Sequence, residues 1–260
     1  VGVKERLEPY PSGPRLCYSV AFRGKAVLLD SPLGLDFADA APLARGLVVE
    51  KETPRGFDTT WERVAGKSRQ VRDHGNELVL DLVESAAPAR RLQVVFRAYD
   101  DGVAFRYVLP EQPGLGAFRL AAERTEFRFA GNHPAWAAPY GSFTTSQEHE
   151  FDKTTLGALT PASMYLSGHG AAANTLVSSL SPRPDDPGVV VEATTPHASP
   201  WRVLMIADHP GRLVESNLVA NLATPLQLKD TSWITPGRSA WDRWWSGDWA
   251  PGADFKVGVN

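Results

Sequence analysis

Cysteine is nearly absent from this 260-residue sequence, which contains only Cys17. A single cysteine excludes an internal disulfide and any metal site built from several thiolates. Its neighbours Leu16 and Tyr18 belong to an apolar run. We therefore expect Cys17 to be a buried small hydrophobe rather than a nucleophile.

The chain also lacks an excess of either charge sign and any long apolar run. It has 27 Lys and Arg against 30 Asp and Glu, a formal net charge of −3. Binding to a nucleic acid backbone is therefore not expected. No apolar stretch approaches the roughly 18 residues that a membrane helix needs, so no membrane partner is expected either. Residues 1–6 do not resemble an export signal and include no initiator Met, so we expect a trimmed or partial gene product.

Motifs of several enzyme classes are missing as well. There is no dinucleotide-binding or Walker-type glycine loop, no zinc-binding His-Glu-x-x-His, and no Gly-x-Ser-x-Gly nucleophile elbow. The six histidines are scattered along the sequence without paired spacing: His74, His133, His149, His169, His197 and His209. Any one of them could act as an acid–base residue, but the sequence does not indicate which.

What the sequence has in quantity is turn-forming residues and short alternating runs. Its 21 Pro and 22 Gly interrupt helices and favour an all-β fold. The strongest signal is Asp101-Gly102 between the alternating runs 91–99 and 103–109, which predicts a hairpin. A second hairpin is predicted over residues 16–29, with its turn at Arg23-Gly24.

Further strands are predicted from shorter patterns. They cover residues 47–52, 60–64, 77–83, 119–129, 189–193 and 201–207. Pro54 and Gly56 predict a turn between the first two. Helix is expected only as a short turn within 208–216 and one or two turns within 146–159. We therefore predict one antiparallel β-sandwich domain over residues 1–236.

Tryptophan is concentrated near the end of the sequence. Four of the eight Trp residues, Trp241, Trp244, Trp245 and Trp249, fall within nine positions. So many large apolar rings need a surface to pack against, because exposed patches of this size are rare on monomers. We interpret residues 237–260 as a connector whose tryptophans form a domain interface.

One acidic segment has the composition of a ligand site. Glu148, Glu150 and Asp152 alternate, so an extended chain would direct three carboxylates to one side, as a hard cation such as Ca²⁺ prefers. Trp136 and Tyr140 lie just upstream. Aromatic faces beside carboxylates are typical of sugar sites, so Trp136 and Tyr140 are candidate substrate-binding residues.

Several segments together resemble the N-terminal domain of glycoside hydrolase family 97. They are residues 16–35, 71–78 and 96–107 and, most specifically, 200–218 and 229–247. The segment 200–218 contains Trp-Arg-Val-Leu-Met-Ile-Ala-Asp-His-Pro-Gly-Arg from Trp201 to Arg212.

The resemblance implies a galactose-mutarotase-like β-super-sandwich that precedes a catalytic (β/α)₈ barrel. The barrel would carry the catalytic carboxylates, so no catalytic residue is expected in this chain. Members of the family act on α-glucosides or α-galactosides with calcium in the active site. The sandwich lends one Glu to that calcium, and the matching segment here begins at Gln147, which makes Glu148 the candidate metal ligand and Glu150 the reserve.

The partners implied are the chain's own barrel and an oligosaccharide substrate, and the implied location is periplasmic or secreted. Two alternatives stay open. The first is a stand-alone carbohydrate-binding module. The second is an aldose-1-epimerase-like enzyme, which needs a His and a Glu as an acid–base pair in one groove.

Overall fold

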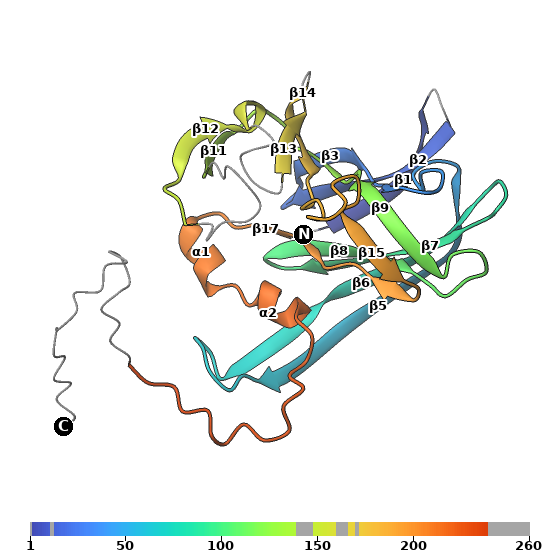
Figure 1. The fold of residues 1–260 in the computed structure, drawn as a ribbon. Helices are drawn as coiled ribbons and strands as arrows, with labels where there is room; N and C mark the ends of the chain where they lie inside the picture. Colours follow the sequence, from blue (N-terminus) through green and yellow to red (C-terminus); the bar gives the residue numbers. More distant parts are fainter. Residues whose placement is uncertain (1, 11–12, 139–147, 160–165, 170–171, 239–260) are drawn as a thin grey trace, which may run out of the picture.

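The structure is a computed structural model that describes residues 2–10, 13–138, 148–159, 166–169 and 172–238. Within these ranges most residues lie in strands, and every paired strand runs antiparallel to its neighbour. The predicted all-β sandwich is therefore confirmed. Figure 1 shows its long β5–β6 hairpin at the bottom of the view and the β1–β2–β3 sheet above it.

The largest sheet has the strand order β16-β8-β7-β6-β5, and β17 also pairs with β8. Its strands are β5 (Leu47–Glu62), β6 (Gln70–Glu84), β7 (Arg91–Tyr99), β8 (Gly102–Leu109), β16 (His197–Ala198) and β17 (Arg202–Met205).

Four smaller sheets complete the described strands. They are β1 (Gly2–Tyr10), β2 (Gly13–Phe22) and β3 (Lys25–Pro32); β4 (Leu35–Phe37), β9 (Ala117–Glu123) and β15 (Val191–Thr194); β10 (Glu126–Arg128), β14 (Ala172–Ser178) and β13 (Leu166–His169); and β11 (Pro134–Ala137) with β12 (Asp152–Thr155).

Both predicted hairpins are present, as β7–β8 and β2–β3. The predicted turn around Pro54 is wrong, because β5 runs unbroken from Leu47 to Glu62. β5 is the edge strand of its sheet, and edge strands tolerate proline because only one of their sides forms ladder hydrogen bonds. The predicted strand 119–129 is divided into β9 and β10.

The main core lies between the largest sheet and the smaller ones. Its centre is an aromatic cluster in which the Tyr18 ring lies 4.9 Å from Phe105 and 6.1 Å from Phe96. Phe127 joins from β10, with its ring 6.3 Å from Phe105. Cys17 is buried, as its apolar neighbours predict. Rings from β2, β7, β8 and β10 thus bring the layers together.

Helices are short and come late in the chain. They are η1 (Leu156–Ala158), α1 (Pro210–Glu215) and α2 (Leu218–Leu222). Leu218 and Leu222 of α2 pack with Tyr99 and Ala104 on the opposite side of the largest sheet from the main core. In the described part of the chain, no helix has the length and apolar character needed to cross a bilayer.

Candidate functional site

The candidate sugar-binding aromatic Trp136 lies on the β11–β12 hairpin. It faces Lys153 in the strand register, and its neighbour Ala137 faces Asp152. The Trp136 residue is 67% exposed, so its ring is accessible. The hairpin is fixed at its base, where the Leu156 amide donates to the His133 carbonyl at 3.1 Å and the Gly157 amide to Asn132 Oδ1 at 2.9 Å.

The candidate calcium ligands lie directly before β12. Glu148 and Glu150 are both exposed and precede the first strand residue, Asp152. Carboxylate oxygens are the right donors for Ca²⁺, but one Ca²⁺ takes 6–8 oxygens. No cluster of three or more metal-ligating side chains occurs among the residues that the structure describes. Glu148 therefore fits as a single donor to a site completed elsewhere, and not as part of a complete cage on these residues.

The other candidate residues lie outside the described ranges. They are Tyr140, Trp241, Trp244, Trp245 and Trp249. Their assigned roles stay predictions.

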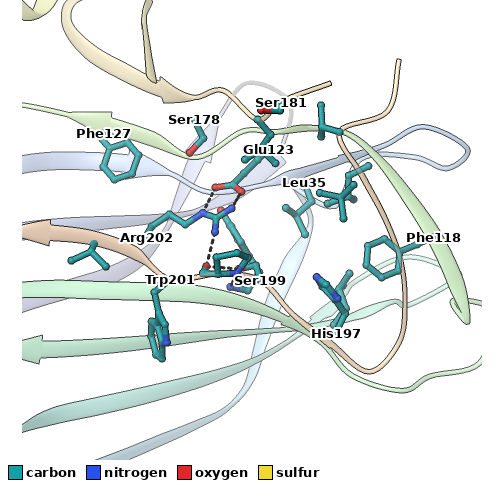
Figure 2. A pocket seen from close by; sticks show the side chains of 18 residues that line it. Leu35, Phe118, Glu123, Phe127, Ser178, Ser181, His197, Ser199, Trp201 and Arg202 are labelled. Carbon is teal, nitrogen blue, oxygen red and sulfur yellow. Dashed lines mark hydrogen bonds and ion pairs between the residues drawn. The ribbon is translucent and has the colours of Figure 1, made fainter. Parts of the chain in front are cut away.

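A cavity of about 470 Å³ opens between the sheets, and Figure 2 shows its lining. Leu35, Phe118 and Leu120 line its apolar end, while Glu123 and Arg202 lie at its polar centre. Arg202 Nε donates to Glu123 Oε1 at 2.8 Å, and its Nη2 donates to the second carboxylate oxygen. The side chains are only 2% and 12% exposed, so this ion pair is nearly dry.

A hydrogen-bond chain extends from this ion pair into the core. Thr125 Oγ1 donates to Glu123 Oε1 at 2.6 Å. Its single proton is then in use, so Tyr107 must donate to Thr125 across the 2.7 Å between their oxygens. The Gly34 amide donates in turn to the Tyr107 hydroxyl at 3.3 Å. Burial and the negative charge of Glu123 raise the pKa of Tyr107 far above its ordinary value, which keeps the hydroxyl protonated.

This cavity does not have the chemistry of a hydrolytic centre. Glycoside hydrolysis ordinarily uses two carboxyl groups across one bond, and Glu123 is the one carboxylate among the described lining residues. Nor does the cavity favour the epimerase alternative. It contains His197 as well as Glu123, but Glu123 is engaged by Arg202 and Thr125, and His197 packs edge-on against Phe118 at 5.5 Å.

Sequence reasoning did not identify this polar centre. Glu123 fell within the alternating run 119–129, and Arg202 within the segment 200–218 that carries the family resemblance. The two residues are 79 positions apart, so no local spacing links them. The charge of each residue was the available signal, and it does not distinguish Glu123 from other charged residues of the same run, such as Arg119 and Arg124.

The fold defines the chain as an antiparallel β-sandwich domain. It matches the family described as "Glycosyl-hydrolase 97 N-terminal" over residues 10–225. The chain belongs to this family, as its sequence resemblance indicated.

Similar proteins are considerably longer than this chain. A "Retaining alpha-galactosidase" of Bacteroides thetaiotaomicron is 24% identical over 95% of this chain and 44% of its own length. A "Probable retaining alpha-galactosidase" of Streptomyces bingchenggensis is 28% identical over 92% of this chain and 39% of its own. The chain thus spans less than half the length of these curated relatives.

Solved structures of glycoside hydrolase family 97 resemble this chain as well. A glycoside hydrolase family 97 enzyme from Pseudoalteromonas sp. strain K8, in complex with acarbose, superposes with a TM-score of 0.79 at 27% identity. The match covers 90% of this chain and 38% of that one. A beta-arabinopyranosidase shares the fold with a TM-score of 0.73 at 22% identity.

Proposed function

We propose that this chain is the non-catalytic N-terminal domain of a longer α-glycosidase that hydrolyses α-galactosides or α-glucosides. The observation that carries the proposal is the asymmetry of coverage: the family match takes in residues 10–225, yet the chain spans only 44% and 39% of two α-galactosidase relatives. The catalytic carboxylates then belong to the remainder of the longer chain. An exported bacterial location is part of the same proposal and rests on the resemblance alone.

In this proposal the domain supplies one wall of the substrate pocket. The exposed ring of Trp136 offers an apolar surface to a sugar face, and Tyr140 is a second candidate. Trp241, Trp244, Trp245 and Trp249 pack against the catalytic part. This division of labour agrees with the absence of a second carboxylate among the described residues around the cavity.

We assign Glu148 as the donor to a shared calcium site. Its carboxylate is exposed on a loop and can reach a neighbouring domain, as a single outside ligand must. A bound calcium ion would supply Lewis-acid polarisation to the pocket. Glu150 lies two positions away on the same exposed loop and is the reserve candidate.

The test is hydrolysis of aryl α-galactosides and α-glucosides by the full-length polypeptide and by the 260-residue chain. We expect activity in the full-length polypeptide and none in the 260 residues. Turnover by the 260 residues would contradict the proposal. Sugar binding without hydrolysis by the full-length polypeptide would favour a carbohydrate-binding module.

A matched pair of variants tests the calcium assignment in the full-length polypeptide. Glu148→Gln should weaken calcium binding, measured by calorimetry, while Glu150→Gln should leave it within about twofold, since Gln keeps the shape but removes the charge. The reverse result would move the assignment to Glu150. Unchanged calcium binding in both variants would contradict calcium donation by this loop.

A further inference from the structure

Three buried polar atoms without a hydrogen-bond partner lie on adjacent strands of the largest sheet. Among the described residues they are Asp73 Oδ1 on β6, the Tyr99 hydroxyl on β7 and Arg106 Nε on β8. Asp73 and Tyr99 lie close enough to influence each other's ionisation, so Arg106 Nε is the atom that requires an explanation, because buried polar groups are almost always satisfied.

All three residues occupy the face of the sheet that points away from the main core. Successive strand residues alternate between faces. Leu78, Phe96 and Phe105, together with residues two positions away on each strand, face the main core. Tyr99 instead packs with Phe57, Trp201 and α2. We call this second side, which bears Asp73, Tyr99, Arg106 and Trp201, the outer face.

Two arginines of the outer face share one carboxylate, and Arg106 has no ion pair among the described residues. Glu77 accepts from Arg55 Nε at 2.5 Å and from Arg97 Nε at 2.8 Å, so one carboxylate serves two guanidinium groups. Arg106 has no carboxylate partner among the described residues, and its guanidinium lies 4.5 Å from the Trp201 ring centre. Burial lowers the pKa of Arg106, and the positive charge of Arg97 lowers it further. The charged form of Arg106 is therefore less favourable here than in water.

Exposed apolar side chains are concentrated in the segment around α2, the helix that packs on the outer face. Six of the eleven large hydrophobic residues that are exposed in the described structure fall within residues 213–233. They are Leu213, Val214, Val219, Leu226, Leu228 and Trp233. This segment includes α2, which is anchored on the outer face by Leu218 and Leu222. Such a concentration is typical of an interaction surface.

We propose that the outer face and residues 213–233 form one docking surface for the catalytic part of the same polypeptide, which presents an Asp or Glu carboxylate to Arg106. The proposal rests on the proposed function, and it adds which face of the sandwich is covered and by what chemistry. The apolar residues supply the packed area, and the carboxylate pairs with Arg106, which has no ion pair among the described residues, whereas Arg55 and Arg97 pair with Glu77 and Arg91 pairs with Glu50.

A second copy of this chain is a poorer occupant. A two-fold dimer places the same patch on both sides, so it would bring Arg106 of one copy towards the Arg55, Arg97 and Arg106 cluster of the other, in which Glu77 already pairs with two guanidinium groups. The longer relatives, by contrast, contain more than half of their length outside the region that this chain matches.

Hydroxyl-radical footprinting of the full-length polypeptide tests the docking surface with two valines as a matched pair. Val214 is 75% exposed in this structure and Val48, on β5, is 45% exposed. If the surface is covered, Val214 should be oxidised at least about threefold more slowly than Val48, since interface cores pack like protein interiors. Faster oxidation of Val214 than of Val48 would overturn the proposal, and so would protection of Val214 that depends on protein concentration, which would indicate a second copy.

Variants of the full-length polypeptide then test the carboxylate. Arg106→Gln should raise the oxidation rate of Val214 and leave that of Val48 unchanged, whereas Arg106→Lys, which keeps the charge, should restore part of the protection. Arg91→Gln is the control, because Arg91 lies on the same sheet but is exposed and already paired with Glu50. Protection of Val214 that is equal in wild type and in Arg106→Gln would overturn the carboxylate assignment.

The footprint is independent of the activity assay. A protected Val214 in a full-length polypeptide that hydrolyses no glycoside would leave the docking surface intact and contradict the proposed function. If Arg106→Gln misfolds, the Val48 rate will rise as well, and the Arg106→Lys variant then decides.

Discussion

Glu123 on β9 and Arg202 on β17 form a nearly dry ion pair that connects the two layers of the sandwich. Arg202 reaches the carboxylate with two of its nitrogens, and Thr125 donates a third hydrogen bond to it. The strands themselves belong to different sheets. The pair therefore fixes the relative position of the layers at the polar centre of the cavity.

Removing one partner of this pair should be strongly destabilising. We expect Arg202→Met to lower the free energy of unfolding by about 3–5 kcal/mol, because it leaves a buried carboxylate without its counter-charge. The double variant Glu123→Leu/Arg202→Met should lose less than the sum of the two single variants. Denaturant unfolding of the 260-residue chain measures this, and strict additivity would contradict the coupling.

Glu84 predicts a specific dependence of stability on pH. Arg90 donates to both carboxylate oxygens, at 2.6 and 2.7 Å, and the side chains are 7% (Arg90) and 13% (Glu84) exposed. The hydrogen bonds from Arg90 lower the pKa of Glu84 despite the opposing effect of burial. The folded state thus binds the proton less tightly than the unfolded state. This contribution to stability is present above the unfolded pKa of about 4.3 and is lost as the pH falls through the folded pKa.

Glu84→Gln should therefore destabilise the chain at pH 7, by about 1–3 kcal/mol, and progressively less towards pH ~3. Glu50→Gln serves as the control, since its ion pair with Arg91 is exposed and contributes about 0–1 kcal/mol. The free energies of unfolding across this pH range provide the measurement. An equal loss in Glu84→Gln at both ends of the range would rule out the linkage.

Local sequence signals predicted the local structure and failed where tertiary context decided. Asp101-Gly102 between alternating runs was sufficient for the β7–β8 hairpin. Pro54 was misleading, because its effect depends on whether its strand lies at an edge of the sheet, and strand order is not written in local spacing. The short helix α2 has only five residues and is held by packing on the outer face, so its sequence carries little periodic signal.

The candidate sites likewise divide into those formed by residues close in sequence and those formed by distant residues. Trp136 and the acidic segment 148–152 were close in sequence, and the hairpin pairing of Ala137 with Asp152 brings the ends of that stretch together. Glu123 and Arg202, and likewise Arg106 and Trp201, come from distant parts of the chain. Their association depends on the sheet register, which pairs Arg202 of β17 with Phe105 beside Arg106.

Gly75 on β6 predicts a steric requirement of the outer face. A Cβ added there would lie 2.7 Å from the Ala98 carbonyl oxygen and 2.9 Å from Phe57 Cζ. Gly56, directly opposite Asn76, would place its Cβ no closer than 3.7 Å to another atom. Gly75→Ala should thus cost about 1–3 kcal/mol. Gly56→Ala should be neutral or stabilising by less than about 1 kcal/mol. Thermal unfolding of both variants checks this, and equal effects would contradict it.

Trp136 predicts a separation between binding and stability. Its residue is 67% exposed, so Trp136→Ala should change the free energy of unfolding by less than about 0.5 kcal/mol. If the ring contacts substrate, the same variant of the full-length polypeptide should bind the glycoside more weakly, with KM raised about threefold or more for the loss of one stacking surface. Phe151→Ala is the control, because Phe151 directly precedes the partner strand β12, is 54% exposed and carries no proposed sugar contact. An unchanged KM in Trp136→Ala, or an equal rise in both variants, would remove Trp136 from the pocket.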